Sequence, residues 1–350
     1  MSNQNKKSAF LKIAIVIVVV IALVGAFILP QLYNKYLKAN TNVSKKTYLY
    51  IPTNATFKQV LDSIDAHQLL INKESFLGLA NDRDLSTRFK SGKYPIEKGM
   101  NNRQILNMLV SGNQEPVDLS FRNIRLKENF AAQASKKLEF DSLSLIQLLD
   151  SAAFVENYGF NTENIYTMFI PNSYQMYWNI SAKDFFIRMN KEYLKFWNVE
   201  RLQKAKLLNL TPQEVTILAS IVDSEALVDK EMPIIAGLYL NRLKRGIKLE
   251  ADPTVIFANN DFTIRRVLNK HLRKESPYNT YMNLGLPPGS IMMPSINAID
   301  AVLNHQNHNY IYMCAKEDFS GFHNFATNLS EHLANAKKFQ NALNQRNIKK

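Results

Sequence analysis

The chain begins with a long apolar run that a soluble domain could not leave in water. The run covers residues 13–29 and, with a shorter apolar shoulder before it, approaches the roughly 20 residues that a membrane-spanning helix needs. It continues past the small residues Gly25 and Ala26, which makes it longer than the core of a usual cleavable signal peptide. We therefore expect residues 9–30 to be a retained transmembrane anchor, with a cleavable signal as the alternative.

The charges around this run indicate its orientation. Lys6, Lys7 and Lys12 precede it, which favours an N-terminus held in the cytoplasm, although further lysines follow it. We expect a cytoplasmic tail over residues 1–8, a single pass through the cytoplasmic membrane and a polar spacer over residues 31–46. Everything after about residue 40 then lies outside the cytoplasm.

The net charge and the cysteine count limit which binding partners and metal sites the chain can have. The 43 Lys and Arg residues outnumber the 30 Asp and Glu residues, for a net charge of +13. A basic chain suits nucleic acid, anionic lipid or a polymer rich in carboxylates, or it has a basic surface without a specific partner. An extracytoplasmic location argues against nucleic acid. The single cysteine, Cys314, excludes an intramolecular disulfide and thiolate metal sites, and we expect no metal and no cofactor.

Two strand–helix units predict a small α/β module over residues 47–115. The first has a strand at 48–51 and an amphipathic stretch at 57–64, and the second has a strand at 94–96 and a helix at 105–110. Asn102 is the expected N-cap of this last helix, and Gly112 the residue that ends it.

An aromatic loop at residues 169–178 lies between helical patterns at 138–149 and 184–197. Exposed aromatic rings on a loop would suit sugar rings, and buried ones would fill the core between the two helices. Both interpretations stay open from the sequence.

The helix boundaries are clearest after residue 210. Thr211 and Glu214 form a capping box with Pro212 at the first helical position, which predicts a helix over 215–228. The remaining local signals predict a helix at 234–245 that ends at Gly246, a helix capped by Asp252, a short helix capped by Ser295, a strand at 310–314 and a last helix opened by Asn328. With the module before it, this mixture predicts an α+β chain whose second domain, residues 116–345, is mixed α/β.

One acidic residue ends an apolar stripe on the helix that begins at Thr211. Val215, Leu218, Val222 and Glu225 are three or four residues apart and share a face. Desolvation there would raise the pKa of Glu225 and leave a carboxyl group able to donate a proton. The alternative is that Glu225 pairs with an arginine inside the fold.

Asp223 is a poor partner for Glu225. Two residues correspond to about 200° of helical rotation, which places the two carboxylates on opposite sides. A glycosidase with both catalytic acids on this helix is therefore disfavoured.

The C-terminal third resembles the YceG-like family, the endolytic murein transglycosylases. The resemblance is carried by an ordered series of strings over about 110 residues: Leu218–Glu225, Leu240–Leu243, Ala251–Phe257, Ser276–Tyr281, Gly285–Ile291 and Phe325–Leu329. Upstream, Phe169–Tyr174 resembles the family's Phe-x-Pro-Asp/Glu-Thr-Tyr loop, and Tyr94–Gly112 resembles its membrane-proximal LysM-like module.

The resemblance implies a fold, a substrate and a mechanism. It implies a LysM-like module at 47–115, a catalytic domain at 116–345, an inner-membrane location and nascent peptidoglycan strands as substrate. Family members cleave the β-1,4 bond between N-acetylmuramic acid and N-acetylglucosamine without water, which leaves 1,6-anhydromuramoyl ends. They are thought to stop strand elongation by neighbouring synthases, which makes such synthases expected partners.

The family's catalytic glutamate corresponds to Glu225. Asp223 and Ser224 depart from the Glu and the basic residue that usually precede it, which leaves the role of Asp223 in doubt. A single acid suffices because the sugar's own 6-hydroxyl replaces water as the nucleophile, and the same carboxyl group acts first as acid and then as base.

Further polar and aromatic residues are expected to contact the sugar. Their side chains suit acetamido sugars, and each is also a possible cap or turn residue: Asn241, Asp252, Tyr278, Asn279, Thr280, Tyr281, Thr327 and Asn328. His323 could orient a carboxylate, but without a spaced partner it predicts no metal site.

Three rival functions remain. One is a non-catalytic peptidoglycan-binding scaffold protein, which an absent acid at position 225 would have indicated. The second is a two-carboxylate hydrolase, which would leave reducing ends instead of anhydro ends. The third is a basic nucleic-acid or anionic-lipid binder, suggested by the net charge of +13, and a C-terminus outside the cytoplasm would remove its nucleic-acid version.

Overall fold

The computed structural model describes residues 2–346 and divides into two compact units. Unit 1 comprises Met1–Val117 and Gln175–Asn179, and unit 2 comprises Asp118–Tyr174 and Ile180–Lys350. Both contain helices, and short antiparallel strand pairs occur in each: β1 pairs with β2 in unit 1, and β5 pairs with β6 in unit 2. The α+β class is confirmed. The first segment of unit 1 ends at residue 117, and the segment 175–179 also belongs to unit 1. The expected division into an anchor, a module and a catalytic domain stays a prediction.

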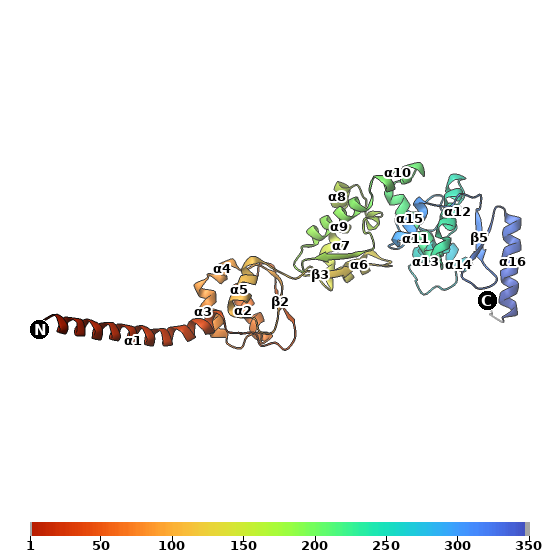
Figure 1. The fold of residues 1–350 in the computed structure, drawn as a ribbon. Helices are drawn as coiled ribbons and strands as arrows, with labels where there is room; N and C mark the ends of the chain where they lie inside the picture. The colour runs from red at the N-terminus through yellow and green to blue at the C-terminus, as the bar shows by residue number, and fades with distance from the viewer. Residues whose placement is uncertain (1, 347–350) are drawn as a thin grey trace. The chain divides into compact units, whose positions relative to one another are not determined.

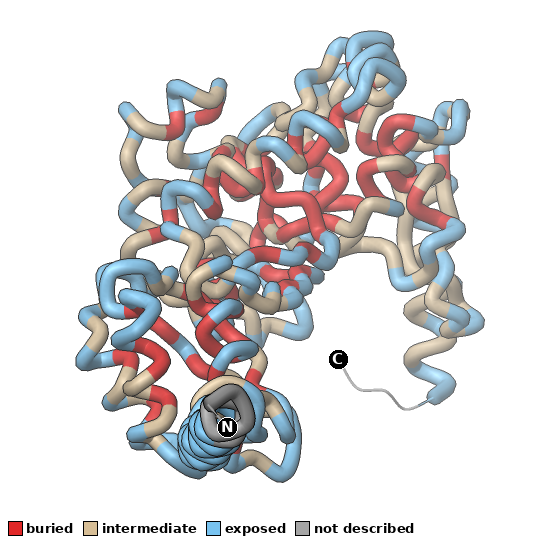
Figure 2. The backbone as a smooth tube through the Cα atoms, turned by 60° about the vertical axis from the view of Figure 1, so that its left-hand side comes forward, coloured by how far each residue is buried: buried red, intermediate tan, exposed pale blue. Residues whose placement is uncertain are grey.

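Helix α1, Ser2–Tyr36, opens unit 1 and is long and apolar enough over residues 9–36 to cross a membrane (Figure 1). Its apolar side chains from Phe10 to Leu29 are exposed, as the helix that follows the N label in Figure 2 shows. One such helix fits a single-pass membrane anchor. The helix continues past Pro30, the end of the expected anchor, to Tyr36.

The end of α1 is attached to unit 1 by polar contacts. Asn102 Nδ2 donates to the carbonyl oxygen of Lys35 at 3.1 Å, and Ser75 Oγ donates to that of Asn34 at 3.0 Å. Lys35 also pairs with Asp82 at 2.5 Å.

The expected polar spacer over residues 31–46 is mostly structured. Its first six residues are helical, and the side chains of Asn40 and Thr41 are buried. Asn40 Nδ2 donates to Asn102 Oδ1 at 2.6 Å, and Asn72 N donates to Asn40 Oδ1 at 2.7 Å. These contacts join residues 37–42 to the helices of unit 1, so little free chain separates α1 from the first folded body.

Unit 1 has the order strand, helices, strand, helix. Its elements after α1 are β1 Thr47–Ile51, α2 Phe57–Ala66, α3 Lys73–Asp82, α4 Leu85–Arg88, β2 Gly92–Ile96 and α5 Asn102–Ser111. The core beneath the sheet is apolar, with Leu49, Ile51 and Tyr94 among its buried members. Gly112 ends α5 with a φ of +74°, as expected, but the N-cap is Asn101. Asn102 is instead the first helical residue, because Asn101 forms the capping box with Gln104, and the buried side chain of Asn102 contacts α1. That the module is LysM-like stays a prediction.

In the aromatic loop at 169–178, some rings are buried in the core and others are exposed, so each of the two interpretations from the sequence applies to part of the loop. Phe169 and Tyr174 are buried in unit 2, where the Phe169 ring lies 4.3 Å from that of Phe130. Tyr177 is exposed, and Trp178 packs edge-on against Tyr50 in unit 1. The first part of the loop is therefore core and not a sugar platform.

Unit 2 contains the remaining elements. These are β3 Val117–Ser120 (which begins on the last residue of unit 1), α6 Lys127–Ser135, α7 Ser142–Leu149, α8 Ala152–Val155, β4 Ser173–Met176 (which ends in the 175–179 segment), α9 Ala182–Phe196, α10 Val199–Leu207, α11 Pro212–Glu225, α12 Met232–Lys244, α13 Asp252–Asn259, α14 Asn269–Leu272, α15 Ile296–Leu303, β5 Tyr312–Ala315, β6 His323–Ala326 and α16 Leu329–Gln345. Short 3-10 turns, η1 Glu156–Tyr158, η2 Ile165–Met168 and η3 Asp229–Glu231, link some of them.

Helix α11 is the centre of unit 2. Every residue from Val215 to Val222 is buried, because α12, α13 and α15 pack around this helix. The capping box of Thr211 and Glu214 is confirmed. The helix ends at Glu225 and not at 228, since the backbone of Ala226 is extended. Glu225 thus stands at the last turn of a rigidly held element.

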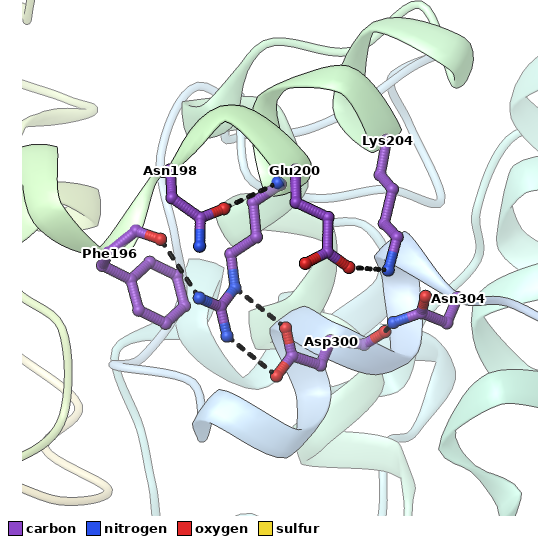
Figure 3. A network of polar contacts seen from close by, with 7 residues as sticks. Phe196, Asn198, Glu200, Lys204, Asp300 and Asn304 are labelled. Atoms are coloured by element: carbon purple, nitrogen blue, oxygen red, sulfur yellow. Dashed lines mark hydrogen bonds and ion pairs between the residues drawn. The ribbon is translucent and has the colours of Figure 1, made fainter.

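Helix α15 is in turn attached to α10. Arg201 donates from Nε and from one terminal nitrogen to the two carboxylate oxygens of Asp300, at 3.0 and 3.1 Å (Figure 3). The same guanidinium contacts the Phe196 ring and carbonyl oxygen. Nearby, Lys204 pairs with Glu200 on the surface of α10. Two-point pairing with a planar guanidinium fixes angle as well as distance.

The C-terminal part of unit 2 is a hairpin with a helix beside it. Strands β5 and β6 pair antiparallel, and α16 lies against both (Figure 1). The expected strand at 310–314 begins two residues later, and Ser295 and Asn328 cap α15 and α16 as expected.

Candidate active site

Glu225 lies partly buried at the C-terminal end of α11. The hydroxyl of Tyr239, on α12, donates to its Oε1 at 3.1 Å. Burial and then the negative charge of Asp252 raise the pKa of Glu225 to about 7, against the Tyr239 hydrogen bond, which lowers it. This environment agrees with the raised pKa that the sequence predicted for Glu225 at the end of the apolar stripe. The carboxyl group can therefore hold or release a proton near neutral pH.

Asp252 and Tyr281 share a pocket of about 470 Å³ with Glu225. The Tyr281 hydroxyl donates to Asp252 Oδ1 at 2.8 Å. Asp252 is not the N-cap of α13, as the sequence suggested, because that position is occupied by Ala251 and Asp252 is the first helical residue. Its carboxylate is thereby free to face the pocket. The structure thus brings a second acidic group to Glu225 from another helix.

The pocket has further polar residues that sequence reasoning did not select. Arg242 lines it and forms an ion pair with Glu250, while its Nε donates to the Lys248 carbonyl oxygen at 2.8 Å. The one arginine lining this pocket therefore pairs with Glu250 and not with Glu225. Tyr239 and Arg242 carry no local signal, because their partners come from helices or loops elsewhere in the chain.

The wall opposite these helices comes from the C-terminal hairpin and α16. Residues 312–315 of β5 contribute, as do His323 and His332. His323 contacts a carboxylate, as anticipated, but that carboxylate belongs to the buried Glu231: its Nδ1 lies 2.9 Å from Glu231 Oε2, and its backbone N–H donates to Oε1 at 2.9 Å. The His332 ring stacks on Tyr312 with centroids 5.1 Å apart.

Asp223 faces a different part of unit 2. Its carboxylate accepts from the backbone N–H and the hydroxyl of Ser295, at 2.8 and 2.9 Å. Ser295 is the N-cap of α15, so the negative charge lies at the N-terminus of that helix, where it is favourable. Asp223 therefore joins α11 to α15, and the predicted opposite orientation of the two acids matches the contacts.

Three of the expected sugar-binding residues stabilise the backbone of unit 2 instead of lining this pocket. Asn241 Nδ2 donates to the carbonyl oxygens of His308 and Tyr310 at 2.7 and 3.0 Å. Asn279 is buried, and its Nδ2 donates to two carbonyl oxygens in residues 272–274. Thr280 is also buried, where its hydroxyl lies 2.7 Å from that of Thr254.

The other three expected residues lie apart from Glu225. Tyr278 lines a separate pocket. Thr327 is exposed and donates to Glu331, and Asn328 is the N-cap of α16. Within residues 2–346, no group of three or more His, Cys, Asp or Glu side chains is arranged to hold a metal ion.

The arrangement offers one titrating acid, one nearby carboxylate and a tyrosine donor in a partly open pocket. Such a site can protonate a leaving oxygen and stabilise positive charge beside it. The pocket volume lies within the range for small-ligand sites.

Comparisons with known proteins identify the family of this chain. Residues 49–338 match the YceG-like family. A Bacillus subtilis protein named endolytic murein transglycosylase is 26% identical over 343 residues, covering 92% of each chain. A Streptococcus pneumoniae protein of the same name is 29% identical over 141 residues, which is 39% of this chain and 25% of that one. The crystal structure of a YceG-like protein from Listeria monocytogenes has a TM-score of 0.53 and 22% identity, over 83% of this chain and 99% of that one, which is a likeness of fold.

Proposed function

Because the chain belongs to the YceG-like family, we propose that it is an endolytic peptidoglycan lytic transglycosylase with Glu225 as its catalytic acid and base. The B. subtilis relative that spans nearly the same length carries the name of this activity. The observation that carries the residue assignment is the position of Glu225: partly buried, bonded by Tyr239 and with a pKa raised to about 7.

In the proposed reaction, Glu225 first donates a proton and later accepts one. The protonated Glu225 carboxyl donates its proton to the oxygen of the β-1,4 bond as the bond from that oxygen to the muramoyl C1 breaks, so that the electron pair leaves with the N-acetylglucosamine fragment. The muramoyl 6-hydroxyl then forms a bond to C1 and gives its proton to the Glu225 carboxylate. The products are a free 4-hydroxyl and a 1,6-anhydro ring, and the acid is restored for another cycle.

Asp252 and Tyr281 support this cycle in two ways. Burial raises the pKa of Glu225, and the negative charge of Asp252 adds to this effect, so that a protonated acid is present near neutral pH. The same charge, held in place by the Tyr281 hydroxyl, favours the positive charge that develops at C1 as the bond breaks. Tyr239 offers a hydrogen bond to the carboxylate that forms.

The membrane segment sets where the enzyme acts. Helix α1 serves as a single-pass anchor with the N-terminus in the cytoplasm, which places both units on the outer side of the inner membrane. The substrate is then the nascent glycan strand, and its cleavage ends elongation by a neighbouring synthase. The LysM-like assignment of residues 47–115 belongs to this proposal, as a module that would lie beside the same strands.

The test is digestion of purified glycan strands by the full-length protein in detergent, with mass spectrometry of the ends. We expect anhydromuramoyl ends from the wild type, none from Glu225→Gln, and anhydromuramoyl ends from the control Asp223→Asn, which changes a carboxylate on the same helix that faces α15.

Three results would overturn the proposal. Anhydro ends from Glu225→Gln would refute the residue. Reducing ends, heavier by one water, would favour a hydrolase. Strand binding without any cleavage by the wild type would favour the non-catalytic scaffold.

A further inference from the structure

Unit 2 contains a second pocket, of about 500 Å³, that shares no lining residue with the Glu225 pocket. The first turn of α6, the end of α13 and the turn around Tyr278 contribute to it, together with Ser290. Sequence reasoning did not identify this pocket, and the proposed reaction does not use it.

Ser290 lines the pocket, and its hydroxyl oxygen is buried and unsatisfied. Its side chain is only 5% exposed, and Ser290 Oγ has no hydrogen-bond partner within the described part of the chain. A buried polar group without a partner costs free energy, so natural proteins rarely leave one without a role. A ligand hydroxyl or carbonyl in the pocket would supply the missing partner.

Two aromatic rings form a face of the same pocket. The rings of Phe257 and Tyr278 are 4.7 Å apart, and both residues are partly exposed. The Tyr278 hydroxyl makes no hydrogen bond to any residue from 2 to 346, so it offers another free donor. Such faces pack well against the apolar C–H side of a pyranose, while the hydroxyl groups meet its polar edge.

Gly289 keeps this region open. A Cβ at position 289 would lie 2.1 Å from the carbonyl oxygen of Glu163 and 2.8 Å from the Tyr278 hydroxyl. Any side chain there would have to displace the backbone at Glu163, and it would crowd the Tyr278 hydroxyl.

The N-terminus of α6 adds backbone donors. Its N-cap is Leu126, which has no side-chain oxygen to accept from the first turn, and Leu126 and Lys127 both line the pocket. The first N–H groups of a helix have no partner inside the helix, so they suit an acceptor such as an acetamido carbonyl.

The charges favour a neutral ligand over a small anion. Lys127 pairs with Asp150, and the Arg125 guanidinium lies over the Phe262 ring at 4.5 Å. Glu128 and Glu163 also line the pocket, so its carboxylates outnumber its cations. Carboxylates accept hydrogen bonds from sugar hydroxyls but repel an anion.

We propose that this pocket binds one N-acetylated pyranose of the glycan strand, away from the bond that is cleaved. The proposal rests on the proposed function, since it takes the glycan strand as the ligand. The two pockets are linked through the chain: Phe257 lies on the same helix as Asp252, about 7.5 Å further along its axis, and Tyr278 precedes Tyr281 by three residues. A sugar here would fix where the strand meets Glu225.

The experiment measures binding of N-acetylglucosamine tetramer to the full-length Glu225→Gln protein in detergent by calorimetry. Ser290→Ala in that background should weaken binding about three- to tenfold, the effect of one lost hydrogen bond, while the melting temperature stays equal or rises because a buried unsatisfied hydroxyl is removed. Phe257→Leu should also weaken binding. Ser135→Ala, which removes a hydroxyl at the other end of α6, should change neither quantity.

Unchanged affinity in both Ser290→Ala and Phe257→Leu overturns the proposal. A second readout uses the active protein, where Ser290→Ala should raise KM for glycan strands and leave kcat within about twofold. Strand cleavage with an unchanged KM refutes this sugar site alone. Ser290-dependent tetramer binding by a wild type that produces no anhydro ends refutes the proposed reaction alone.

Discussion

At the scale of single residues, the central feature is that Glu225 experiences opposing influences. Burial and Asp252 favour its neutral form, and the Tyr239 hydroxyl favours its charged form. The balance leaves a pKa of about 7, so both forms are populated near neutral pH. A group that must donate and then accept the same proton works best with that balance.

The raised pKa of Glu225 makes the free energy of unfolding depend on pH. The ordinary pKa of 4.5 applies to the unfolded chain, and the folded value is about 7, so the folded state binds more protons between these values. The free energy of unfolding therefore falls as pH rises from 4.5 to 7. Glu225→Gln removes this dependence and should be more stable than the wild type by about 2 kcal/mol at pH 8, after allowance for partial exposure.

Thermal or denaturant unfolding of both proteins at pH 4.5 and pH 8 checks this prediction. We expect the difference in unfolding free energy between the two proteins to grow with pH. A difference that is the same at both values would contradict a raised folded-state pKa.

Asp252 should set the upper pH limit of activity. In the proposed reaction Glu225 must be protonated to act, so the rate should fall as pH rises through about 7. Asp252→Asn removes a negative charge that raises the pKa of Glu225, and we expect the falling limb of the kcat/KM profile to move to lower pH. Asp223→Asn should leave that limb in place, and a limb that stays in place in both variants would exclude the coupling between Asp252 and Glu225.

The sequence predicted one half of this site. Helical periodicity predicted that Glu225 lies on the buried face of its helix and Asp223 on the opposite side. Both predictions were possible because they depend only on the period of 3.6 residues within one helix. The contact between Asp252 and Tyr281 joins residues 29 apart, and no local pattern encodes it. The same lack of long-range information made Asp252 read as an N-cap.

At the scale of elements, two ion pairs of different geometry near α10 should contribute differently to the free energy of unfolding. Arg201 and Asp300 are joined at two points and partly buried, while Glu200 and Lys204 are a single-point pair on one exposed helix surface (Figure 3). We expect Asp300→Asn to lower the free energy of unfolding by about 1–2 kcal/mol and Glu200→Gln by less than about 0.5 kcal/mol.

Denaturant titration of the two variants measures the contrast. Equal losses would show that the second contact point of Arg201 adds nothing to the attachment of α15.

Helix starts were predicted more accurately than contacts between elements. Thr211, Ser295 and Asn328 cap their helices as expected, because an N-cap depends on four consecutive residues. The N-cap of α5 was misplaced by one residue, from Asn101 to Asn102. The sequence does distinguish the two asparagines, because Gln104 lies three residues after Asn101 and completes a capping box with it. The prediction overlooked that signal.

At the scale of the whole molecule, the attachment of α1 to unit 1 depends strongly on Asn102. This buried side chain contacts the Lys35 carbonyl oxygen, Ser75 and Asn40. We expect Asn102→Ala to increase hydrogen exchange of the amides at residues 34–41 in vesicles at least tenfold, because the buried partners of Asn102 would lose their hydrogen bonds.

Asn42→Ala, which removes an exposed hydrogen bond to the carbonyl of Gln68, is the matched control. Similar exchange in both variants would show that the apolar contacts of unit 1, and not Asn102, hold the end of α1.

Because α1 is one continuous helix, it limits how far unit 1 can move from the apolar part of that helix. Asn34, whose carbonyl oxygen accepts from Ser75, lies four residues after Pro30, which is about 6 Å along the helix. If α1 spans the bilayer as proposed, this short helical link keeps unit 1 close to the membrane surface. Unit 1 would then reach polymer soon after its export and not the older material further out, so a preference for new polymer would follow from distance alone.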